Sequence, residues 1–360
     1  MPNVTNHIIN RRSAVLAPVF LAASKSLLST HAFSDSTQLG QVIERKRLIV
    51  AATPNSSTVF KSDGYMHGFG YDLSKGYANQ IGVDLDVRIF TSQAAALKAV
   101  KKGDVDFALT SANSVALEQI GLAPVNLSCG DKPSLYRFGL DAEVNWSFAD
   151  GSDPLAQQAT SFICSPTQVG INKKLAAFYD QSLFKDTYSK TQFDKAMRDR
   201  LPAYKASFKS NAEKHQVDWQ LLVAMGYQES HLKANAVSPT GVRGLMMLTS
   251  ATARSMGITN RTDPNQSIKG GANYIRQMQD QFDHVPEPDR TWFALAAYNM
   301  GPGAVRSVQK KLKAQGKNPN DWMEFYDYLS DNSARNSRYN QCIHYVTRIR
   351  TYLETIKQTT

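Results

Sequence analysis

The stretch DWQLLVAMGYQESH, residues 218–231, determines how the rest of the sequence is interpreted. Asp218 is a typical helix N-cap, and the apolar run Trp219–Met225 that follows it predicts a largely buried helix. Glu229 stands at the end of this helix. A carboxyl group beside so apolar a segment is poorly solvated, which raises its pKa and suits it to act as a general acid near neutral pH. The segment alone is equally compatible with an exposed glutamate at a helix end, so both interpretations stay open.

Downstream of this helix, turn signals and capping residues predict a series of further helices. The Gly- and Pro-rich loop 238–244 interrupts the helical pattern before the apolar run 245–248. Capping residues and helical spacing then predict helices at about 249–256, 263–282, 289–300 and 339–355. We find no convincing strand pattern after about Tyr188, so we expect an all-helical region from there to the end.

The sequence before this region has a different pattern. Between residues 47 and 110, strand-like apolar runs alternate with helix-like segments in the order strand, helix, strand, helix, strand. This order is typical of a doubly wound α/β unit. Residues 121–168 indicate only short strands and loops. The predicted fold class is therefore α+β overall, with an α/β lobe first, a helical region second, and a boundary near residues 185–200.

Two motifs in the first region, GFGYDL (68–73) and the segment 97–106, resemble the fold of amino-acid-type periplasmic solute-binding proteins. That fold binds its ligand between two α/β lobes, near the ends of the strands. The resemblance implies a cleft for a small ligand such as a muropeptide, lined by Phe69, Asp72, Thr110 and Ser111.

This chain departs from the solute-binding pattern in two ways. Residues 111–185 are too few to supply a complete second lobe, and the segment NSVALEQ (113–119) lacks the arginine that usually pairs with a ligand carboxylate. The alternative interpretation is that Phe69 is a packing residue and Asp72 a helix N-cap.

Residues 1–32 resemble an export signal. Arg11 and Arg12 precede the apolar run 14–23, and residues 30–32 have the small-residue character of a processing site. The run is too short to span a bilayer. We therefore expect a periplasmic protein in which residues 36–195 form the α/β domain and residues 200–360 form the helical domain. Peripheral association with the outer membrane stays open.

Composition limits the other classes of function. The net charge of +10 favours an anionic partner, but the basic residues are scattered and no nucleic-acid motif accompanies them, so we expect no nucleic-acid partner. The three cysteines lack metal-ligand spacing, and we expect no metal and no cofactor. Cys129 and Cys164 would pair in an oxidising compartment, or stay as two buried thiols. The sequence does not indicate an oligomeric state.

Four motifs in the helical region resemble, in order, those of the lytic transglycosylase domain with its lysozyme-like fold. They are YQESH (227–231), SPTGVRGLMML (238–248), ALAAYNMGPG (294–303) and HYVTRI (344–349). Four motifs in order are far more specific than any one of them. The resemblance extends over residues 201–356. Together with the solute-binding-like front region, the whole resembles the membrane-bound lytic murein transglycosylase F group, with a shortened front domain.

The resemblance implies a role for each matched residue. Glu229 corresponds to the single catalytic acid and base, Ser230 to a polar neighbour counted with the catalytic residues, and Tyr345 to the tyrosine whose hydroxyl points toward the carboxylate. The implied substrate-binding residues are Gly244, Leu245, Met246, Met247, Tyr298 and Asn299. Many relatives carry Gln at the position of Met247, so an amide contact to substrate is not implied here, and Met at this position agrees with the F-type group. Taken singly, the tyrosines and methionines could equally be core residues, and Asn299 a helix cap.

The implied reaction is cleavage of the β-1,4 bond between N-acetylmuramic acid and N-acetylglucosamine in peptidoglycan glycan strands, leaving a 1,6-anhydro end. One carboxylate suffices because the muramoyl C6 hydroxyl is a tethered nucleophile. Two alternatives stay open: a lysozyme-type hydrolase of peptidoglycan, and a non-catalytic solute receptor or wall-binding module. The front domain would regulate the enzyme or act as a spacer.

Overall fold

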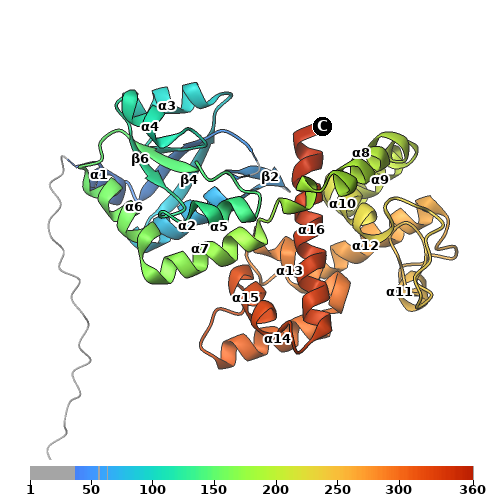
Figure 1. Ribbon diagram of the computed structural model, residues 1–360. Coiled ribbons are helices and arrows are strands. Elements are labelled where there is room, and N and C mark those ends of the chain that lie inside the picture. The colour runs from blue at the N-terminus through green and yellow to red at the C-terminus, as the bar shows by residue number, and fades with distance from the viewer. Residues whose placement is uncertain (1–36, 56, 63, 360) are drawn as a thin grey trace, which may run out of the picture.

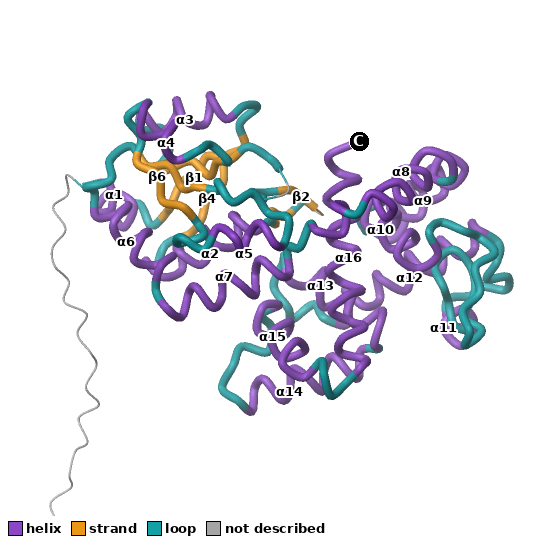
Figure 2. The backbone as a smooth tube through the Cα atoms, viewed as in Figure 1, coloured by secondary structure: helices purple, strands orange, loops and turns teal. Residues whose placement is uncertain are grey.

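The computed structural model describes residues 37–55, 57–62 and 64–359, and combines a five-stranded sheet and a two-stranded hairpin with many helices (Figure 1). The predicted export signal, residues 1–32, lies outside the described residues. No helix in the described ranges is both long enough and apolar enough to cross a membrane. Figure 2 shows that the strands gather in the first part of the chain and that helices make up the rest. The predicted α+β class is therefore confirmed, with the α/β part first.

The first part is built on a five-stranded sheet in the order β4-β1-β5-β7-β6. The neighbouring strands β4, β1 and β5 run parallel to one another. Strand β7 pairs antiparallel with β5, and β6 pairs antiparallel with β7. The strand bounds are β1 (Arg47–Ala52), β4 (Asp84–Ile89), β5 (Phe107–Thr110), β6 (Ala123–Asn126) and β7 (Asn145–Phe148). The predicted alternation of strand and helix between residues 47 and 110 is confirmed. The sequence did not predict the separate hairpin of β2 (Phe60–Ser62) and β3 (Tyr65–His67).

Helices cover both faces of this sheet. Apolar residues of α3 and α4 pack on Ala51 and Ala108 on one face, while α2 and α6 cover the large aromatic residues of the other face. The sheet is therefore buried on both sides, as the nearly continuous apolar sequence of β1 requires. The helices of this part are α1 (Gln38–Glu44), α2 (Phe69–Ile81), α3 (Gln93–Lys102), α4 (Ser114–Gln119), α5 (Lys132–Arg137), α6 (Pro154–Cys164) and α7 (Pro166–Phe178).

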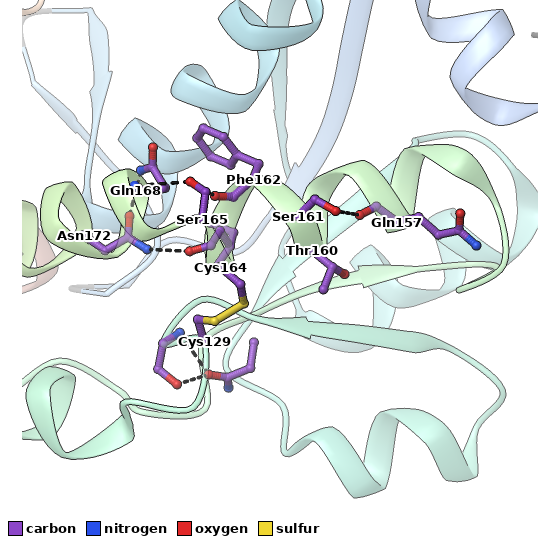
Figure 3. Close-up of a disulfide and its surroundings, with 12 residues drawn as sticks. Cys129, Gln157, Thr160, Ser161, Phe162, Cys164, Ser165, Gln168 and Asn172 are labelled. Atoms are coloured by element: carbon purple, nitrogen blue, oxygen red, sulfur yellow. Dashed lines mark hydrogen bonds between the residues drawn. A yellow bond between two sulfur atoms is a disulfide. The ribbon is translucent and has the colours of Figure 1, made fainter. Parts of the chain in front are cut away.

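A disulfide joins Cys129, in the loop after β6, to Cys164 at the end of α6 (Figure 3). The sequence left this pair open, and the structure pairs the two cysteines with Cα atoms 5.3 Å apart. Next to the disulfide, the side chain of Gln168 donates to Asn172 Oδ1 at 2.7 Å. The disulfide thus ties the antiparallel edge of the sheet to the junction between α6 and α7.

We predict that replacing both Cys129 and Cys164 with serine lowers the free energy of unfolding by about 2–4 kcal/mol. The covalent link closes a loop with a sequence separation of 35 residues, and removing it lets the unfolded chain gain entropy. Urea denaturation measures the change. The control compares oxidised wild-type protein with wild-type protein kept in a reductant. If these two samples and the variant unfold at the same urea midpoint, the prediction is contradicted.

The rest of the chain is helical, as predicted. Two isolated bridges, between Val237 and Arg243 and between Arg243 and Leu248, are the β interactions that the described part of this region contains. The predicted N-caps are confirmed: side-chain oxygens of Asp218, Thr249 and Asp263 accept hydrogen bonds from the first turns of their helices. The elements are η1 (Ser182–Lys185), α8 (Thr187–Asp199), α9 (Leu201–His215), α10 (Trp219–Ser230), α11 (Ser250–Ser255), α12 (Pro264–Gln281), α13 (Asp289–Met300), α14 (Pro302–Ala314), α15 (Trp322–Asn332) and α16 (Ser337–Thr359).

Helix α16 lies in the middle of the helical region and packs against α10, α13 and α15 (Figure 1). Its buried residues include Tyr345 and Val346 in the first half and Arg350 and Glu354 in the second half. Helix α13 is buried along almost its whole length. The two apolar helices α10 and α13 therefore flank α16 and fix its position.

The two parts of the chain share one continuous hydrophobic core. The ring of His67, in β3, lies between Phe60 and Trp292 of α13, with ring centroids 5.3 and 5.1 Å away. Trp292 also contacts the ring of Phe178, at the end of α7. The Phe178 ring centroid lies 5.6 Å from that of Trp292 and 5.7 Å from that of Trp322. Burial lowers the pKa of His67 to about 3, so this ring is neutral at physiological pH. The seam between the two parts is therefore packed like a protein interior.

Candidate active site

Glu229 is the next-to-last residue of α10, as the sequence predicts. The helix is buried from Leu221 to Tyr227 and ends at His231, which adopts a left-handed conformation with φ of 54°. The Glu229 side chain is partly accessible to solvent. Burial by the surrounding protein raises its pKa to about 7, and a hydrogen bond from Tyr345 opposes this rise. A carboxyl group in this state can carry a proton near neutral pH and release it at little cost.

Tyr345 lies on α16, 116 residues further along the chain, and its hydroxyl donates to Glu229 Oε1 at 2.6 Å. Burial, and then the nearby charge of Glu229, raise the pKa of this tyrosine well above its ordinary value. The hydroxyl thus keeps its proton over the physiological range and acts as a fixed donor. The structure brings these two predicted residues together because α10 and α16 pack side by side.

Tyr298, near the end of α13, lies close to the same carboxyl group. The charge of Glu229 contributes to the raised pKa of Tyr298, after burial. The Tyr298 hydroxyl donates to the main-chain oxygen of Met246 at 3.0 Å. The neighbouring Asn299 side chain is partly exposed, and its amide has no hydrogen-bond partner among the described residues. The Asn299 amide is therefore available to a bound ligand.

The loop before α11 is held in one shape by Gly244. This glycine has φ of +90°, and a Cβ atom there would lie 1.8 Å from the main-chain oxygen of Arg261. No other residue fits without moving the backbone. The next two residues, Leu245 and Met246, have fully buried side chains. Met247, with φ of 47°, is partly exposed.

This burial corrects the predicted substrate contact of Leu245 and Met246 for their side chains and leaves it untested for their main-chain groups. Both side chains belong to the core; Met246, for example, packs directly on the backbone of Gly271 in α12. Their apolar side chains gain more from burial than from lining a wet surface. Of the predicted loop residues, Met247 is the one whose side chain can meet a ligand.

Ser230 also has a different role from the predicted catalytic one. Its hydroxyl lies 2.8 Å from the Leu245 carbonyl and 3.1 Å from the Gly226 carbonyl, and it accepts a hydrogen bond from the Lys233 amide. The hydroxyl is buried and fully used by these main-chain groups. We therefore interpret Ser230 as a positioning residue that joins the end of α10 to the loop of Gly244.

The sequence missed one neighbour of this site, Tyr274 of α12. Its ring stacks at a tilt on Tyr298, with centroids 5.1 Å apart, and is partly exposed. Tyr274 stands in an ordinary amphipathic helix and outside the four motifs, so no local signal could have identified it. The ring of His231, two residues after Glu229 in the sequence, stacks on Tyr227 with the centroids 4.8 Å apart.

The predicted cleft in the first part of the chain is wrong for two of its four lining residues, Phe69 and Thr110, whereas Asp72 and Ser111 are partly exposed. Phe69 is fully buried and Thr110 is 2% exposed, so neither can line an open cleft. Asp72 accepts a hydrogen bond from the Tyr179 hydroxyl at 2.7 Å, and Ser111 accepts one from Asn55 at 3.2 Å. Asp72 is also not the N-cap of α2, which is Gly68. These polar groups serve the packing of α2 and of the sheet, which the short sequence motif could not reveal.

Comparison with known proteins agrees with the motifs. A family model described as "Transglycosylase SLT domain" matches residues 206–320. The membrane-bound lytic murein transglycosylase F of Pseudomonas fluorescens (strain Pf0-1) is 32% identical over 347 residues, covering 93% of this chain and 67% of the relative. The protein of the same name from Stutzerimonas stutzeri (strain A1501) is 37% identical over 273 residues, covering 72% of this chain and 54% of the relative.

Among solved structures, the lytic transglycosylase Slt of Pseudomonas aeruginosa aligns with 81% of this chain and 46% of its own, at 17% identity and a TM-score of 0.38. At that TM-score the alignment carries no argument about the fold. The sequence relatives are informative, although this chain spans only about half to two thirds of their length. On the strength of the matched domain and of these relatives, the chain belongs to the membrane-bound lytic murein transglycosylase F family.

Proposed function

We propose that this chain is a peptidoglycan lytic transglycosylase in which Glu229 acts first as acid and then as base. The observation that carries the proposal is the carboxyl group of Glu229, with a pKa raised to about 7 and a hydrogen bond from Tyr345. The names of its relatives, which describe murein transglycosylases, support the choice of substrate. Met247, Tyr298 and Asn299 are the proposed substrate contacts.

In the proposed reaction, protonated Glu229 gives its proton to the glycosidic oxygen between N-acetylmuramic acid and N-acetylglucosamine. The C1–O bond breaks, and the muramoyl N-acetyl group stabilises the positive charge that develops at C1. The carboxylate of Glu229 then takes the proton of the muramoyl C6 hydroxyl, whose oxygen bonds to C1 and closes a 1,6-anhydro ring. Proton balance is restored, and water takes no part.

The electrostatics of Glu229 support a mechanism with one carboxylate. Burial and the hydrogen bond from Tyr345 are the causes of its pKa shift, and among the described residues no second carboxylate contributes. Ordinary glycosidases need a second carboxylate as base or nucleophile. A tethered C6 hydroxyl has a high effective concentration and replaces it.

Mass spectrometry of the products of purified murein sacculi tests the proposed function. The proposal requires 1,6-anhydromuramoyl ends. Reducing ends would indicate a lysozyme-type hydrolase instead, and intact sacculi would indicate a receptor or wall-binding module. Incubation in ¹⁸O-labelled water adds a second readout, because only a hydrolase incorporates the label.

We predict that Tyr345→Phe lowers the rate about 10-fold at pH 7 and raises the pKa of Glu229. The hydroxyl of Tyr345 lowers that pKa, and its loss also frees the carboxyl group to change rotamer. The pH profile of kcat/KM should shift so that the limb from Glu229 moves to higher pH. Tyr188→Phe, at an exposed tyrosine, is the control. A lower rate with an unshifted pH profile would contradict the positioning role.

We also propose a periplasmic location and two domains, residues 36–195 and 200–360. The disulfide supports an oxidising compartment, since such bonds are rare in the cytoplasm. The regulatory role of the front domain, a muropeptide or other small ligand for it, and association with the outer membrane stay predictions. The described residues contain no cluster of three or more side chains suited to hold a metal ion.

A further inference from the structure

Tyr274 of α12 presents a partly exposed ring beside the candidate active site. It lies one helical turn after Gly271, whose backbone packs on the side chain of Met246. Residues three apart share a helix face, so Tyr274 lies on the side of α12 that meets the loop of Gly244. Helix α12 also packs against α13 (Figure 1). There the ring of Tyr274 is tilted by 55° to that of Tyr298, with centroids 5.1 Å apart, and this tilted contact leaves part of the ring uncovered.

The hydroxyl group of Tyr274 is free and accessible. The hydroxyls of the two neighbouring tyrosines are engaged, since Tyr298 donates to the Met246 main-chain oxygen and Tyr345 donates to Glu229. In the described ranges the Tyr274 hydroxyl has no hydrogen-bond partner, and it is not among the side-chain atoms there that are closed to solvent. Burial of the side chain raises its pKa, so the hydroxyl keeps its proton. Tyr274 therefore offers a donor and an acceptor to a ligand.

Tyr274 lies farther from Glu229 than Tyr298 does. The charge of Glu229 contributes to the raised pKa of Tyr298, and the neighbouring Tyr274 contributes after it. Burial is the cause of the raised pKa of Tyr274, and Glu229 does not contribute to it. Tyr298 thus stands closer to the acid and also contacts Tyr274. A ligand that reaches both Glu229 and Tyr274 extends beyond the bond that Glu229 would protonate.

We propose that Tyr274 binds a sugar ring of the glycan strand, away from the reacting bond. This inference rests on the proposed function, because it takes peptidoglycan as the ligand. A half-buried tyrosine offers a rigid apolar face and a polar edge at a small cost in conformational entropy. A pyranose ring has the complementary surfaces, with C–H bonds on its faces and hydroxyl or acetamido groups at its rim. The Tyr274 ring packs on the face of the sugar, and its hydroxyl forms a hydrogen bond with the rim.

Calorimetric titration with a murein tetrasaccharide free of stem peptides tests the proposal. Full-length chains that carry Glu229→Gln are used, so that the sugar is bound and not cleaved. Adding Tyr274→Leu should weaken binding about 10-fold, because the aromatic face is lost. Adding Tyr274→Phe should weaken it about 3-fold, because one neutral hydrogen bond is lost. Tyr136→Leu, at an exposed tyrosine of α5 in the first part of the chain, is the matched control and should leave binding unchanged.

Kinetics in chains that keep Glu229 separate sugar binding from a structural role of the ring. Tyr274→Leu should raise KM for soluble glycan strands about 10-fold and change kcat less than about 2-fold, with an unshifted pH profile. A ring that merely supports Tyr298 predicts a different result. In that case Tyr274→Leu would lower kcat at unchanged KM, and Tyr274→Phe, which keeps the ring, would behave as wild type.

Unchanged affinity for the tetrasaccharide in both Tyr274 variants would overturn the inference, and so would a loss confined to kcat. Either result leaves the proposed function standing if the wild type still forms 1,6-anhydromuramoyl ends. Intact sacculi together with no binding of the tetrasaccharide would overturn both proposals. Thermal melting checks the fold of each variant. Should Tyr274→Leu fail to fold, the affinity of Tyr274→Phe decides alone.

Discussion

Glu229→Gln should lower the rate of peptidoglycan cleavage at least ~100-fold while the protein stays folded. The amide keeps the size of the side chain and can still accept the hydrogen bond of Tyr345, but it has no proton to give and no charge with which to take one back. Release of soluble muropeptides from purified sacculi measures the rate. Glu118→Gln, at an exposed glutamate of α4, is the control and should leave the rate unchanged.

The same substitution should change how stability depends on pH. The pKa of Glu229 is about 7 in the folded chain and about 4.5 in the unfolded chain. Ionising it therefore destabilises the fold: stability is full below pH 4.5 and is lost as the pH rises through 7. Glu229→Gln removes this loss, so the variant should exceed wild type by roughly 1–3 kcal/mol at pH 8 and match it at pH 4.

Urea denaturation at the two pH values checks this expectation. The combination of lost activity and increased stability at pH 8 identifies a strained acid, since a merely structural residue would lose both. Full activity of Glu229→Gln would refute the proposed mechanism. If Glu229→Gln loses activity as expected but is no more stable than wild type at pH 8, then the pKa of Glu229 in the folded protein is near that of an ordinary glutamate.

Arg350→Met should destabilise the protein by about 3–5 kcal/mol. Arg350 is fully buried on α16, where it pairs with Glu354, itself 1% exposed. Its guanidinium also donates to the main-chain oxygens of Phe178, at 2.9 Å, and Asp180, at 2.7 Å. Removal of the guanidinium would leave the buried Glu354 carboxylate without its counter-ion and the Phe178 carbonyl without its side-chain donor, although Gln181 still donates to Glu354 and Thr351 to the Asp180 carbonyl. Burial already raises the pKa of Glu354, and loss of Arg350 raises it further.

Thermal and urea unfolding measure this effect, with Arg348→Met on the exposed face of the same helix as the control. The control should change stability by less than about 0.5 kcal/mol. The double variant Arg350→Met with Glu354→Leu should recover part of the loss, because it removes the stranded charge as well. A double variant whose loss equals the sum of the two single losses would show that the pair does not act as a unit.

The local parts of the fold could be predicted from the sequence. Asp218, Thr249 and Asp263 each cap a helix within three residues, so their effect is visible in a short window. The alternation of strands and helices from residue 47 to 110 is likewise visible in short windows of the sequence. The hairpin of β2 and β3 escaped prediction because its three-residue strands are too short for a periodic signal.

Long-range features were harder to predict. Arg350 stands in a polar stretch of α16 and looks like an exposed arginine until α7 covers it. Leu245 and Met246 stand in a loop motif, and only the packing of α12 shows that their side chains point inward. Tyr345 and Glu229 are 116 residues apart, and their proximity was implied by family resemblance alone. The sequence pattern of one helix or loop does not show which of its residues are covered by a distant part of the chain.

The continuous core at the seam has a practical consequence for dissecting this protein. A fragment beginning after residue 185 would lack Phe178 and His67, and would expose the indole rings of Trp292 and Trp322 to water. It would also lose the carbonyl groups that hold Arg350, only five residues from Tyr345 on the same helix. Such a fragment should aggregate or lose activity without any change to its own residues. Limited proteolysis between the parts is therefore a poor route to a working minimal enzyme.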